Sequence, residues 1–481
     1  TVRVEGKGMV SVSEVEVGDR VVQQTDSGFQ HRPVEETHAY EDAETLTVRL
    51  ANGLTVRGTP NHRLMVDDSW TRLDEIQAGQ EMHYALGWLR ETETDPPELA
   101  SVASGGRWGE NRTVENAEIR ELHREGLSDY EIAERLDCGK STVQRRRSHE
   151  LGLSPNGDGG RNPGATSFDE RAALDLYRDG HTDSEVADQL GVHPTTVSQF
   201  RAREQLDPNG KPAKTVRQPE HLDETLAELV GLWVGDGSWH QDGVRFHVKR
   251  ESIAEYIDQL SRQLFGTSAS VSFADGCYEV IINSHEIRRW WDSNFDCKPD
   301  GARSARVPRA VRSAPANVVE SFLRGYFTAD GTLLDGTYPK LYSSSERAID
   351  DVASLMMGLG YPVKKSVIRD EDAHPYFGVV PTTGTGRKAF LRDVGFIDER
   401  RETALSNIES VAARDSYVIG DEYTVEVDAV VESDPATVYD ITVEDNHEYV
   451  TDGIVSHNSG GGMGYAFWRL RPYGDAVGST G

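Results

Sequence analysis

The chain has 481 residues, which is enough for several domains that each bury a hydrophobic core. Its 81 acidic and 51 basic residues give a formal net charge of -30, which argues against nucleic-acid binding by the surface as a whole. The same excess fits the acidic surface of a halophilic protein, so local charge has to indicate the partners.

The cysteines are few and widely spaced, a pattern that excludes paired zinc ligands and a disulfide framework. No apolar run approaches the length of a membrane span. We therefore expect a cytoplasmic protein that has no membrane partner.

The first 90 residues are predicted to be β structure. Short alternating runs such as Val2–Val4 are separated by turn signals such as the Asn-Gly pair at 52–53. One turn holds Thr59 and His62 with two residues between them, directly before an apolar run. Alone, such a pair is typical of a turn with a capping histidine.

Residues 91–112 are a linker by composition, and an internal repeat follows within 113–212. Residues 118–147 recur at 172–201 with an offset of 54. Each copy is predicted to form a helix, a glycine break, a capped second helix, a short turn and a last helix. The plain interpretation is a pair of three-helix bundles.

This repeat resembles the helix-turn-helix of site-specific recombinases and transcription regulators, whose last helix enters the major groove of DNA. The resemblance implies a double-stranded DNA partner. Local positive charge would bind its phosphates, and the candidate residues are Lys140, Arg145, Arg146, Arg147, Arg201 and Arg203.

Two apolar helices are predicted to end in Asp-Gly, one at Asp236 and one 94 residues later at Asp330. Each carries a glycine five residues before the aspartate, at Gly231 and Gly325. A glycine inside a helix costs stability, but it lets two helices approach backbone to backbone. Two carboxylates at adjacent helix C-termini repel each other unless a divalent cation lies between them. The pattern therefore predicts a metal site at Asp236 and Asp330.

The paired helices resemble those of the LAGLIDADG homing endonucleases in their pseudo-symmetric single-chain form. This resemblance implies an α+β fold over 219–410, Mg²⁺ bound by the two aspartates, and two β-sheet saddles laid along DNA. The family often has a lysine before the second motif helix, where this sequence has Ala305 and Arg306. Alternative lysines in the second half are Lys364, Lys365 and Lys388.

Near the end of the chain, residues 438–459 alternate apolar residues with turn-formers and end in His457, Asn458 and Ser459. An asparagine amide attacks its own backbone carbonyl and cuts the chain after itself when an imidazole protonates the leaving amine. A serine directly downstream is a nucleophile that can receive an acyl group. Taken alone, the segment is also consistent with a plain β-hairpin and tail.

Together with Thr59 and His62, this block resembles the splicing domain of inteins, the all-β Hint fold. The resemblance implies that Thr59 and His62 hold and protonate the upstream scissile peptide. It implies that Asp440 coordinates the steps, that His447 and His457 assist the cyclisation of Asn458, and that Ser459 captures the acyl group. The splicing domain would then be split between 1–90 and 415–458.

Inteins begin with Cys or Ser, whereas this chain begins with Thr1, so we expect the first nucleophile to be missing and the chain to be unable to complete splicing. Residues 459–481 resemble the glycine-rich active-site segment of adenosylcobalamin-dependent ribonucleotide reductase. That resemblance implies a reductase host as the flanking extein, with the cobalamin bound by the host only. A phosphate-binding loop is the alternative, but its Gly-Lys-Ser/Thr is absent here.

Two other functions compete with this interpretation. A Hedgehog-type self-processing domain shares the β fold, but it would lack the His-Asn-Ser end and the endonuclease. A plain DNA-binding regulator would explain 113–205 and neither end of the chain. The sequence therefore predicts a multidomain protein with an all-β split splicing domain, an all-α helix-turn-helix pair and an α+β endonuclease.

Overall fold

The computed structural model divides the chain into two compact units, Thr1–Val102 with Val216–Gly481, and Ala103–Thr215. The described residues are 1–25, 28–92, 94–102, 116–127, scattered positions between 129 and 156, 169–178, 181–203, 216–241, 243–295, 301–368, 374–412, 423–445 and 447–457. No helix in these ranges combines the length and the apolar composition that crossing a bilayer requires.

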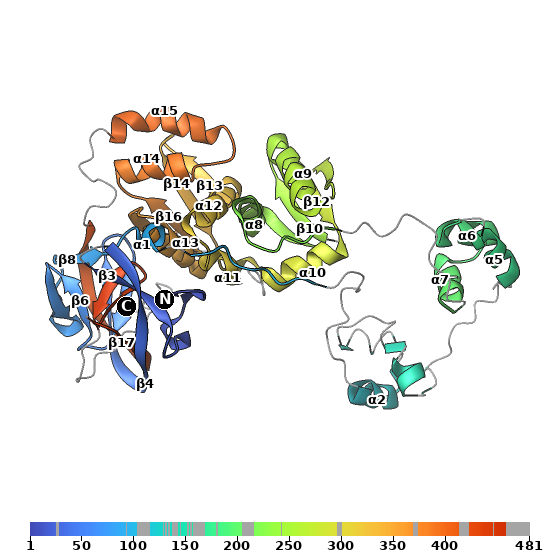
Figure 1. The fold of residues 1–481 in the computed structure, drawn as a ribbon, viewed down its shortest axis with the longest axis horizontal. Coiled ribbons are helices and arrows are strands. Elements are labelled where there is room, and N and C mark those ends of the chain that lie inside the picture. The colour runs from blue at the N-terminus through green and yellow to red at the C-terminus, as the bar shows by residue number, and fades with distance from the viewer. Residues whose placement is uncertain are drawn as a thin grey trace, which may run out of the picture. The chain divides into compact units, whose positions relative to one another are not determined.

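One part of the larger unit is an antiparallel 11-stranded sheet with the main order β17-β4-β3-β1-β18-β19-β8-β6-β7 (Figure 1). Its strands from the start of the chain are β1 (Val2–Val4), β2 (Gly8–Val10), β3 (Arg20–Thr25), β4 (Gly28–Leu50), β5 (Thr55–Gly58), β6 (Arg63–Val66), β7 (Ser69–Arg72) and β8 (Glu81–Tyr84). Its strands from the end are β17 (Tyr423–Val443), β18 (Glu448–Thr451) and β19 (Ile454–His457). Short helical turns η1 (Val12–Glu14) and η2 (Leu73–Glu75) and helix α1 (Trp88–Glu91) also belong to this part.

The sheet interleaves strands from the two ends of the chain. The hairpin β18–β19 lies between β1 and β8, and the long strand β17 pairs with β4 along most of its length. A buried cluster joins Val2 and Val4 of β1 to Ile441 and Val443 of β17 and Tyr449 of β18. Each buried side chain of this size contributes roughly 1.5–3 kcal/mol. The two segments predicted to form a split β domain therefore share one sheet and one core.

The rest of the larger unit repeats one pattern of helices and strands. The first copy consists of α8 (Glu224–Asp236), β9 (Gly237–His240), β10 (Gly243–Val248), α9 (Glu251–Phe265), β11 (Ser270–Ala274), β12 (Cys277–Asn283) and α10 (His285–Asn294). After η4 (Ala302–Ser304) and α11 (Arg309–Arg312), the second consists of α12 (Ala316–Asp330), β13 (Gly331–Leu334), β14 (Tyr338–Ser343), α13 (Glu346–Gly358), β15 (Val363–Ile368), β16 (Tyr376–Pro381) and α14 (Gly384–Asp393). Helix α15 (Arg400–Ala412) follows.

The two copies build sheets of the same topology. The first sheet has the order β11-β12-β10-β9, and the second has the matching order β15-β16-β14-β13. Helix α9 packs against the first sheet and α13 against the second. This internal repetition is the α+β, pseudo-symmetric arrangement predicted for 219–410.

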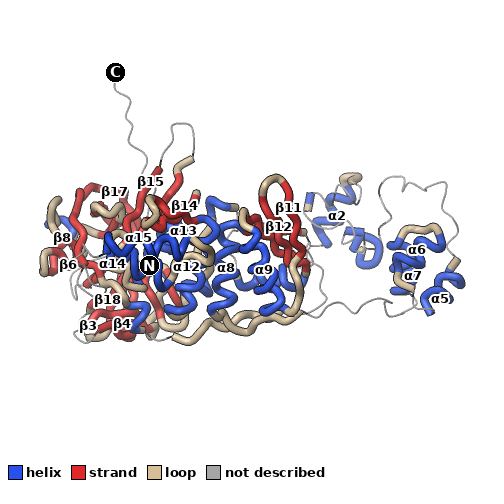
Figure 2. Tube along the Cα trace, turned by 90° about the horizontal axis from the view of Figure 1, so that it is seen from above, coloured by secondary structure: helices blue, strands red, loops and turns tan. Residues whose placement is uncertain are grey.

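Helices α8 and α12 lie side by side at the centre of this part (Figure 2). An ideal Cβ on Gly231 would lie 2.1 Å from the carbonyl oxygen of Phe322, and one on Gly325 would lie 2.1 Å from that of Glu228. No larger side chain fits at either position without moving a backbone. The two glycines therefore allow the backbone contact that the sequence predicts.

The smaller unit is helical where it is described. It contains α2 (Asn116–Arg124), the π-helical turn η3 (Arg146–Glu150), α5 (Glu170–Arg178), α6 (Asp183–Leu190) and α7 (Pro194–Arg203). A capping box between Thr182 and Glu185 starts α6, and Gly191 ends it at φ 63°. Val186, Val197 and Phe200 then pack together in a small core. The second copy thus has the predicted helix-turn-helix order.

Candidate functional site

Thr59 and His62 lie in the turn between β5 and β6. The backbone N–H of His62 donates to the carbonyl of Thr59 at 3.1 Å, and that of Leu73 donates to the carbonyl of His62 at 2.9 Å. The Thr59 side chain is nearly buried and His62 is fully buried. Neither ring nitrogen of His62 forms a hydrogen bond within the described part of the chain. Hydrogen bonds therefore fix the backbone of the turn at His62, and the imidazole of His62 is buried.

His457 comes from the other end of the chain to the same place. It ends β19 and pairs with Arg63, the first residue of β6, so it lies next to the turn that holds His62. Its ring packs edge-on against Trp70 at 4.9 Å between centroids. Burial, with a further contribution from His457, lowers the pKa of His62 to about 3. His62 is therefore neutral near pH 7 and can donate one N–H without carrying charge. Asn458 and Ser459 lie outside the described residues.

Asp440 is buried on β17, with 3% of its surface exposed. It accepts a hydrogen bond from the backbone N–H of Ile441 at 2.9 Å and one from the hydroxyl of Tyr449 at 3.4 Å. Burial raises the pKa of Asp440 to about 7, and these hydrogen bonds oppose the rise only in part. A carboxyl group with this pKa can hold or release a proton near neutral pH.

His447 lies in the turn between β17 and β18, at a φ of 59°. Its Nδ1 atom lies 3.1 Å from the carbonyl oxygen of Val443. The next residue, Glu448, pairs with His457 across the β18–β19 hairpin. The hairpin thus brings His447 close to the end of β19 along the strand ladder.

Asp236 and Asp330 line one cavity of about 720 Å³ at the ends of α8 and α12. An ideal Cβ on Gly235 would lie 3.3 Å from Cγ of Asp330, so that carboxyl group lies over the last turn of α8. Basic residues share the lining: Lys249, Arg250 and Arg400. The structure therefore brings the two predicted metal ligands together.

The donor set of this cavity suits Mg²⁺, which is commonly bound by one or two carboxylates together with water and substrate phosphates. Asp236 and Asp330 are the residues that would hold the ion. The described residues contain no group of three or more His, Cys, Asp or Glu side chains arranged to hold a metal. Water and substrate phosphates would supply the other oxygen ligands.

The lysine of this cavity is one that the sequence reasoning missed. Lys249 directly follows β10 and lines the cavity, whereas Lys364 and Lys388 do not. Lys365 is buried elsewhere and pairs with Glu346 at 2.7 Å and Asp350 at 2.6 Å. The signal available in the sequence was the basic pair Lys249-Arg250 at the end of a strand that follows Asp236.

Ala305 and Arg306, which stand where the endonuclease family often has its lysine, form contacts elsewhere. Arg306 donates to Asp351 at 2.9 Å, and Ala305 is buried with its carbonyl accepting from the Ser345 hydroxyl at 2.6 Å. Neither contributes to the lining of the cavity that holds Asp236 and Asp330.

Two of the predicted DNA-binding arginines form ion pairs within the helical unit. Arg147 is buried and pairs with Asp129 at 2.6 and 3.0 Å. At the equivalent positions of the second copy, Arg201 pairs with Asp183 at 3.1 and 3.2 Å. The pair of Arg201 and Asp183 joins α7 to α6. A phosphate would have to compete with these ion pairs, so DNA binding by Arg147 and Arg201 stays a prediction.

Of the four remaining basic candidates, Arg203 and Arg146 are described by the structure. The Arg203 side chain is 56% exposed and pairs with Glu170 at 2.8 Å, an exposed contact that solvent screens. Arg146 is partly buried, and its Nε atom is enclosed by the protein. Lys140 and Arg145 lie outside the described residues.

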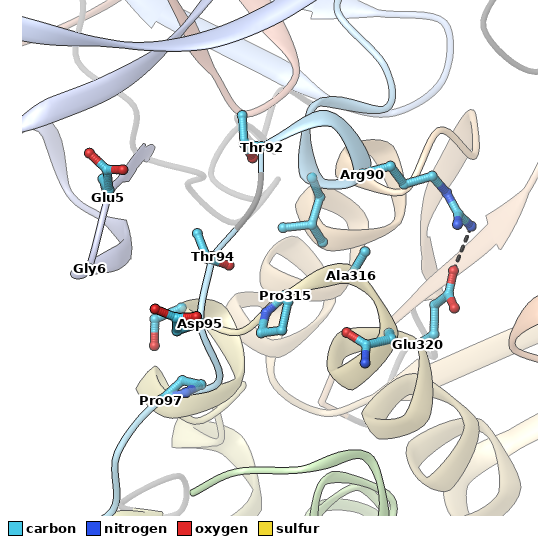
Figure 3. Close-up of a pocket in the computed structure, with 13 residues that line it drawn as sticks. Glu5, Gly6, Arg90, Thr92, Thr94, Asp95, Pro97, Pro315, Ala316 and Glu320 are labelled. Atoms are coloured by element: carbon cyan, nitrogen blue, oxygen red, sulfur yellow. Dashed lines mark ion pairs between the residues drawn. The ribbon is translucent and has the colours of Figure 1, made fainter.

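A larger cavity, of about 860 Å³, lies between the first strands and α12 (Figure 3). Its lining includes Glu5, Asp95 and Glu320, and Glu320 pairs with Arg90 at 2.6 Å. None of the predicted site residues lines it. Its carboxylates disfavour a DNA phosphate, so we place no catalytic step there.

Comparison with known proteins gives a family for the chain. The family model described as intein splicing domain matches residues 4–458. A DNA polymerase of Thermococcus hydrothermalis is 28% identical over 276 residues, which cover 52% of this chain and 16% of that protein. The replication factor C small subunit of Methanocaldococcus jannaschii is 23% identical over 362 residues, which cover 70% of this chain and 18% of that protein. The chain thus spans less than a fifth of either relative.

Solved structures are similar over parts of the chain only. The structure of I-DmoI in complex with DNA and Mn matches 36% of this chain and 98% of its own, at 15% identity and a TM-score of 0.29. A DnaB intein from Synechocystis sp. PCC 6803 matches 18% of this chain and 70% of its own, at 16% identity and a TM-score of 0.14. Because the family model extends over nearly the whole chain, from the first strand to the end of β19, the chain belongs to the intein family.

Proposed function

We propose that His62, Thr59, Asp440 and His457 act as one splicing centre. The observation that carries the proposal is the pairing of His457 on β19 with Arg63 on β6, directly after the turn of His62. The neutral imidazole of His62 donates an N–H to the upstream scissile peptide, with Thr59 holding that peptide in the same turn. Burial keeps both groups fixed, so little reorganisation is needed when the peptide carbonyl becomes electron-rich.

The downstream step is the cyclisation of Asn458. Its side-chain nitrogen attacks its own backbone carbonyl carbon, and the bond to the nitrogen of Ser459 breaks. A proton passes to that leaving amine from His457, with Asp440 and His447 supporting the transfer. Before this step, the nucleophile at the upstream junction takes the upstream acyl group as its peptide bond breaks, and the Ser459 hydroxyl then displaces that nucleophile and carries the acyl group as an ester. After the cyclisation frees the Ser459 amine, an oxygen-to-nitrogen shift breaks the ester and forms the new peptide bond.

A precursor that carries both flanking segments, with a cysteine or serine as the nucleophile at the upstream junction, tests this assignment. Asn458→Ala removes the amide that would form the succinimide, so mass spectrometry should find no ligated product and no release of the downstream segment. The matched control is Asn407→Ala, an exposed position on α15 that should splice like the wild type. Normal ligation by the Asn458 variant would refute the assignment.

We further propose that the α+β part is a homing endonuclease that cuts double-stranded DNA. Asp236 and Asp330 hold Mg²⁺, which when bound supplies electrostatic stabilisation to a phosphate under attack. Lys249 lines the same cavity, and its ammonium would add positive charge at the scissile phosphate. The helical unit adds binding area through Arg203 and Arg146, together with Lys140 and Arg145.

The assay for this activity is cleavage of DNA that carries the uninterrupted host gene, with and without Mg²⁺. Asp236→Asn and Asp330→Asn should each abolish cleavage and spare DNA binding and splicing. Metal-dependent cleavage by the doubly substituted protein would refute the site. A wild-type protein that binds this DNA and never cuts it would indicate an inactive enzyme.

The proposed host is a ribonucleotide reductase of the adenosylcobalamin-dependent class, on the resemblance of residues 459–481. Sequencing the ligated product of a splicing precursor from the source genome tests this proposal. The cobalamin would bind the ligated reductase and not the excised chain. A ligated product without reductase sequence would reject the host assignment.

A further inference from the structure

The segment between α14 and α15 crosses the C-terminal end of α12, the helix that carries Asp330. The backbone N–H of Ile397 donates to the hydroxyl of Thr328 at 3.0 Å. The guanidinium of Arg400 donates to the carbonyl of Thr328 at 2.6 Å and to that of Gly331 at 2.7 Å. The end of α12 is therefore held by residues that belong to neither α8 nor α12.

Asp398 fixes the orientation of Arg400. The Asp398 side chain is 1% exposed and accepts from Nε and Nη2 of Arg400, both at 2.8 Å. It also accepts from Arg250 at 2.5 Å. Burial acts to raise the pKa of Asp398, but the hydrogen bonds from Arg400 and the nearby charge of Arg250 hold that pKa below its usual range. Asp398 is therefore an ionised group shared by two guanidiniums.

The shared carboxylate joins the two halves of the α+β part. Arg250 lies directly before α9 in the first half, whereas Arg400 begins α15 after the second half. Both arginines line the cavity that holds Asp236 and Asp330. A planar guanidinium can donate to two carbonyls and a carboxylate at once, which a lysine ammonium on a flexible stem reproduces poorly.

We propose that Arg400 is a positioning residue for Asp330, because it binds the carbonyl of Thr328 in the last turn of α12 and that of Gly331 directly after the helix, and so sets the direction in which the Asp330 carboxylate faces the cavity. The inference rests on the proposed metal site of the endonuclease. Partners that orient a metal ligand from behind commonly change metal affinity by 10–100-fold when they are removed. Arg400 would act in this way through the helix end, without touching the metal.

A positioning role and a purely electrostatic role predict opposite changes in metal affinity. Removing a positive charge beside a carboxylate makes the site more negative, which tightens the binding of a cation. Removing the hydrogen bonds from Arg400 to the end of α12 frees the helix end and misplaces Asp330, which weakens the binding of the cation. The sign of the change therefore separates the two roles.

The experiment is a titration of the full-length protein with Mn²⁺ alone. Electron paramagnetic resonance measures the concentration of free Mn²⁺ at each step and so gives the affinity. Arg400→Gln should bind Mn²⁺ roughly tenfold more weakly than the wild type. Arg400→Lys keeps the charge but cannot make all the contacts, so it should be closer to Arg400→Gln than to the wild type. Unchanged or tighter binding by Arg400→Gln would overturn the inference, as would wild-type affinity in Arg400→Lys.

Controls separate this result from unfolding and from failure of the metal site itself. Arg262→Gln breaks an exposed pair with Asp258 on α9 and should leave Mn²⁺ affinity unchanged. Circular dichroism should show wild-type helix content for each variant, and Arg400→Lys decides the question if Arg400→Gln does not fold. If Asp330→Asn leaves wild-type Mn²⁺ binding unchanged, the proposed metal site is wrong, which is a different outcome from an Arg400 variant that behaves like the wild type.

Discussion

The buried carboxyl of Asp440 makes a quantitative prediction for the pH dependence of stability. Its pKa is raised to about 7 by burial, whereas an unfolded chain releases this proton near pH 4. Between these two values the folded state binds more protons than the unfolded state, so the free energy of unfolding falls as pH rises. The folded state holds about one extra proton between pH 5 and pH 7, and one proton changes the free energy of unfolding by about 1.4 kcal/mol per pH unit. The free energy of unfolding should therefore fall by about 2–3 kcal/mol between pH 5 and pH 8.

Asp440→Asn removes this titration and keeps an oxygen that can accept from Ile441 and Tyr449. Urea denaturation at pH 5 and pH 8, followed by β-sheet circular dichroism, should show that the wild type loses about 2–3 kcal/mol more than the variant over this range. The matched control is Asp428→Asn, an exposed position on the same strand, which should lose as much as the wild type. Equal losses in the wild type and Asp440→Asn would mean that the carboxylate is ionised and stabilised in the folded protein, which would refute the reasoning.

Three other predictions follow from contacts in the structure. Gly231→Ala should push α8 and α12 apart and lower DNA cleavage about 100-fold, since a misplacement of about 1 Å has that effect, whereas the exposed Glu255→Ala on α9 should cut normally. Arg201→Met should lower the thermal stability of the helical unit, whereas Arg203→Met should leave stability unchanged and weaken DNA binding; the reverse pattern would contradict the roles given to them. The His62 ring should stay neutral from pH 8 down to about pH 4 in an NMR titration, and a midpoint near 6.5 would contradict its burial.

The sequence could predict the elements whose signals are local. The Asp-Gly ends of α8 and α12, with a glycine five residues earlier, predicted a close helix pair, and the structure confirms that contact. The alternation of apolar residues at both ends of the chain predicted a split β domain, and the family match and the shared sheet confirm it.

The sequence could not predict interactions between residues that are distant along the chain. Arg147 and Arg201 resemble surface charges in the sequence, because only the packed helices bring Asp129 and Asp183 to them. Lys249 and Arg400 were missed for the same reason. Their places in the cavity depend on how β10 and α15 meet the ends of the two glycine-containing helices.

The proposed splicing centre joins residues from both ends of the chain, and the intact mass of the products from a precursor with His62→Gln tests it. Because the buried His62 is the proposed donor to the upstream scissile peptide, the upstream bond should stay uncut and no ligated product should form. Release of the downstream segment through Asn458 should continue, since that step uses His457. Ligated product at the wild-type rate would contradict the account.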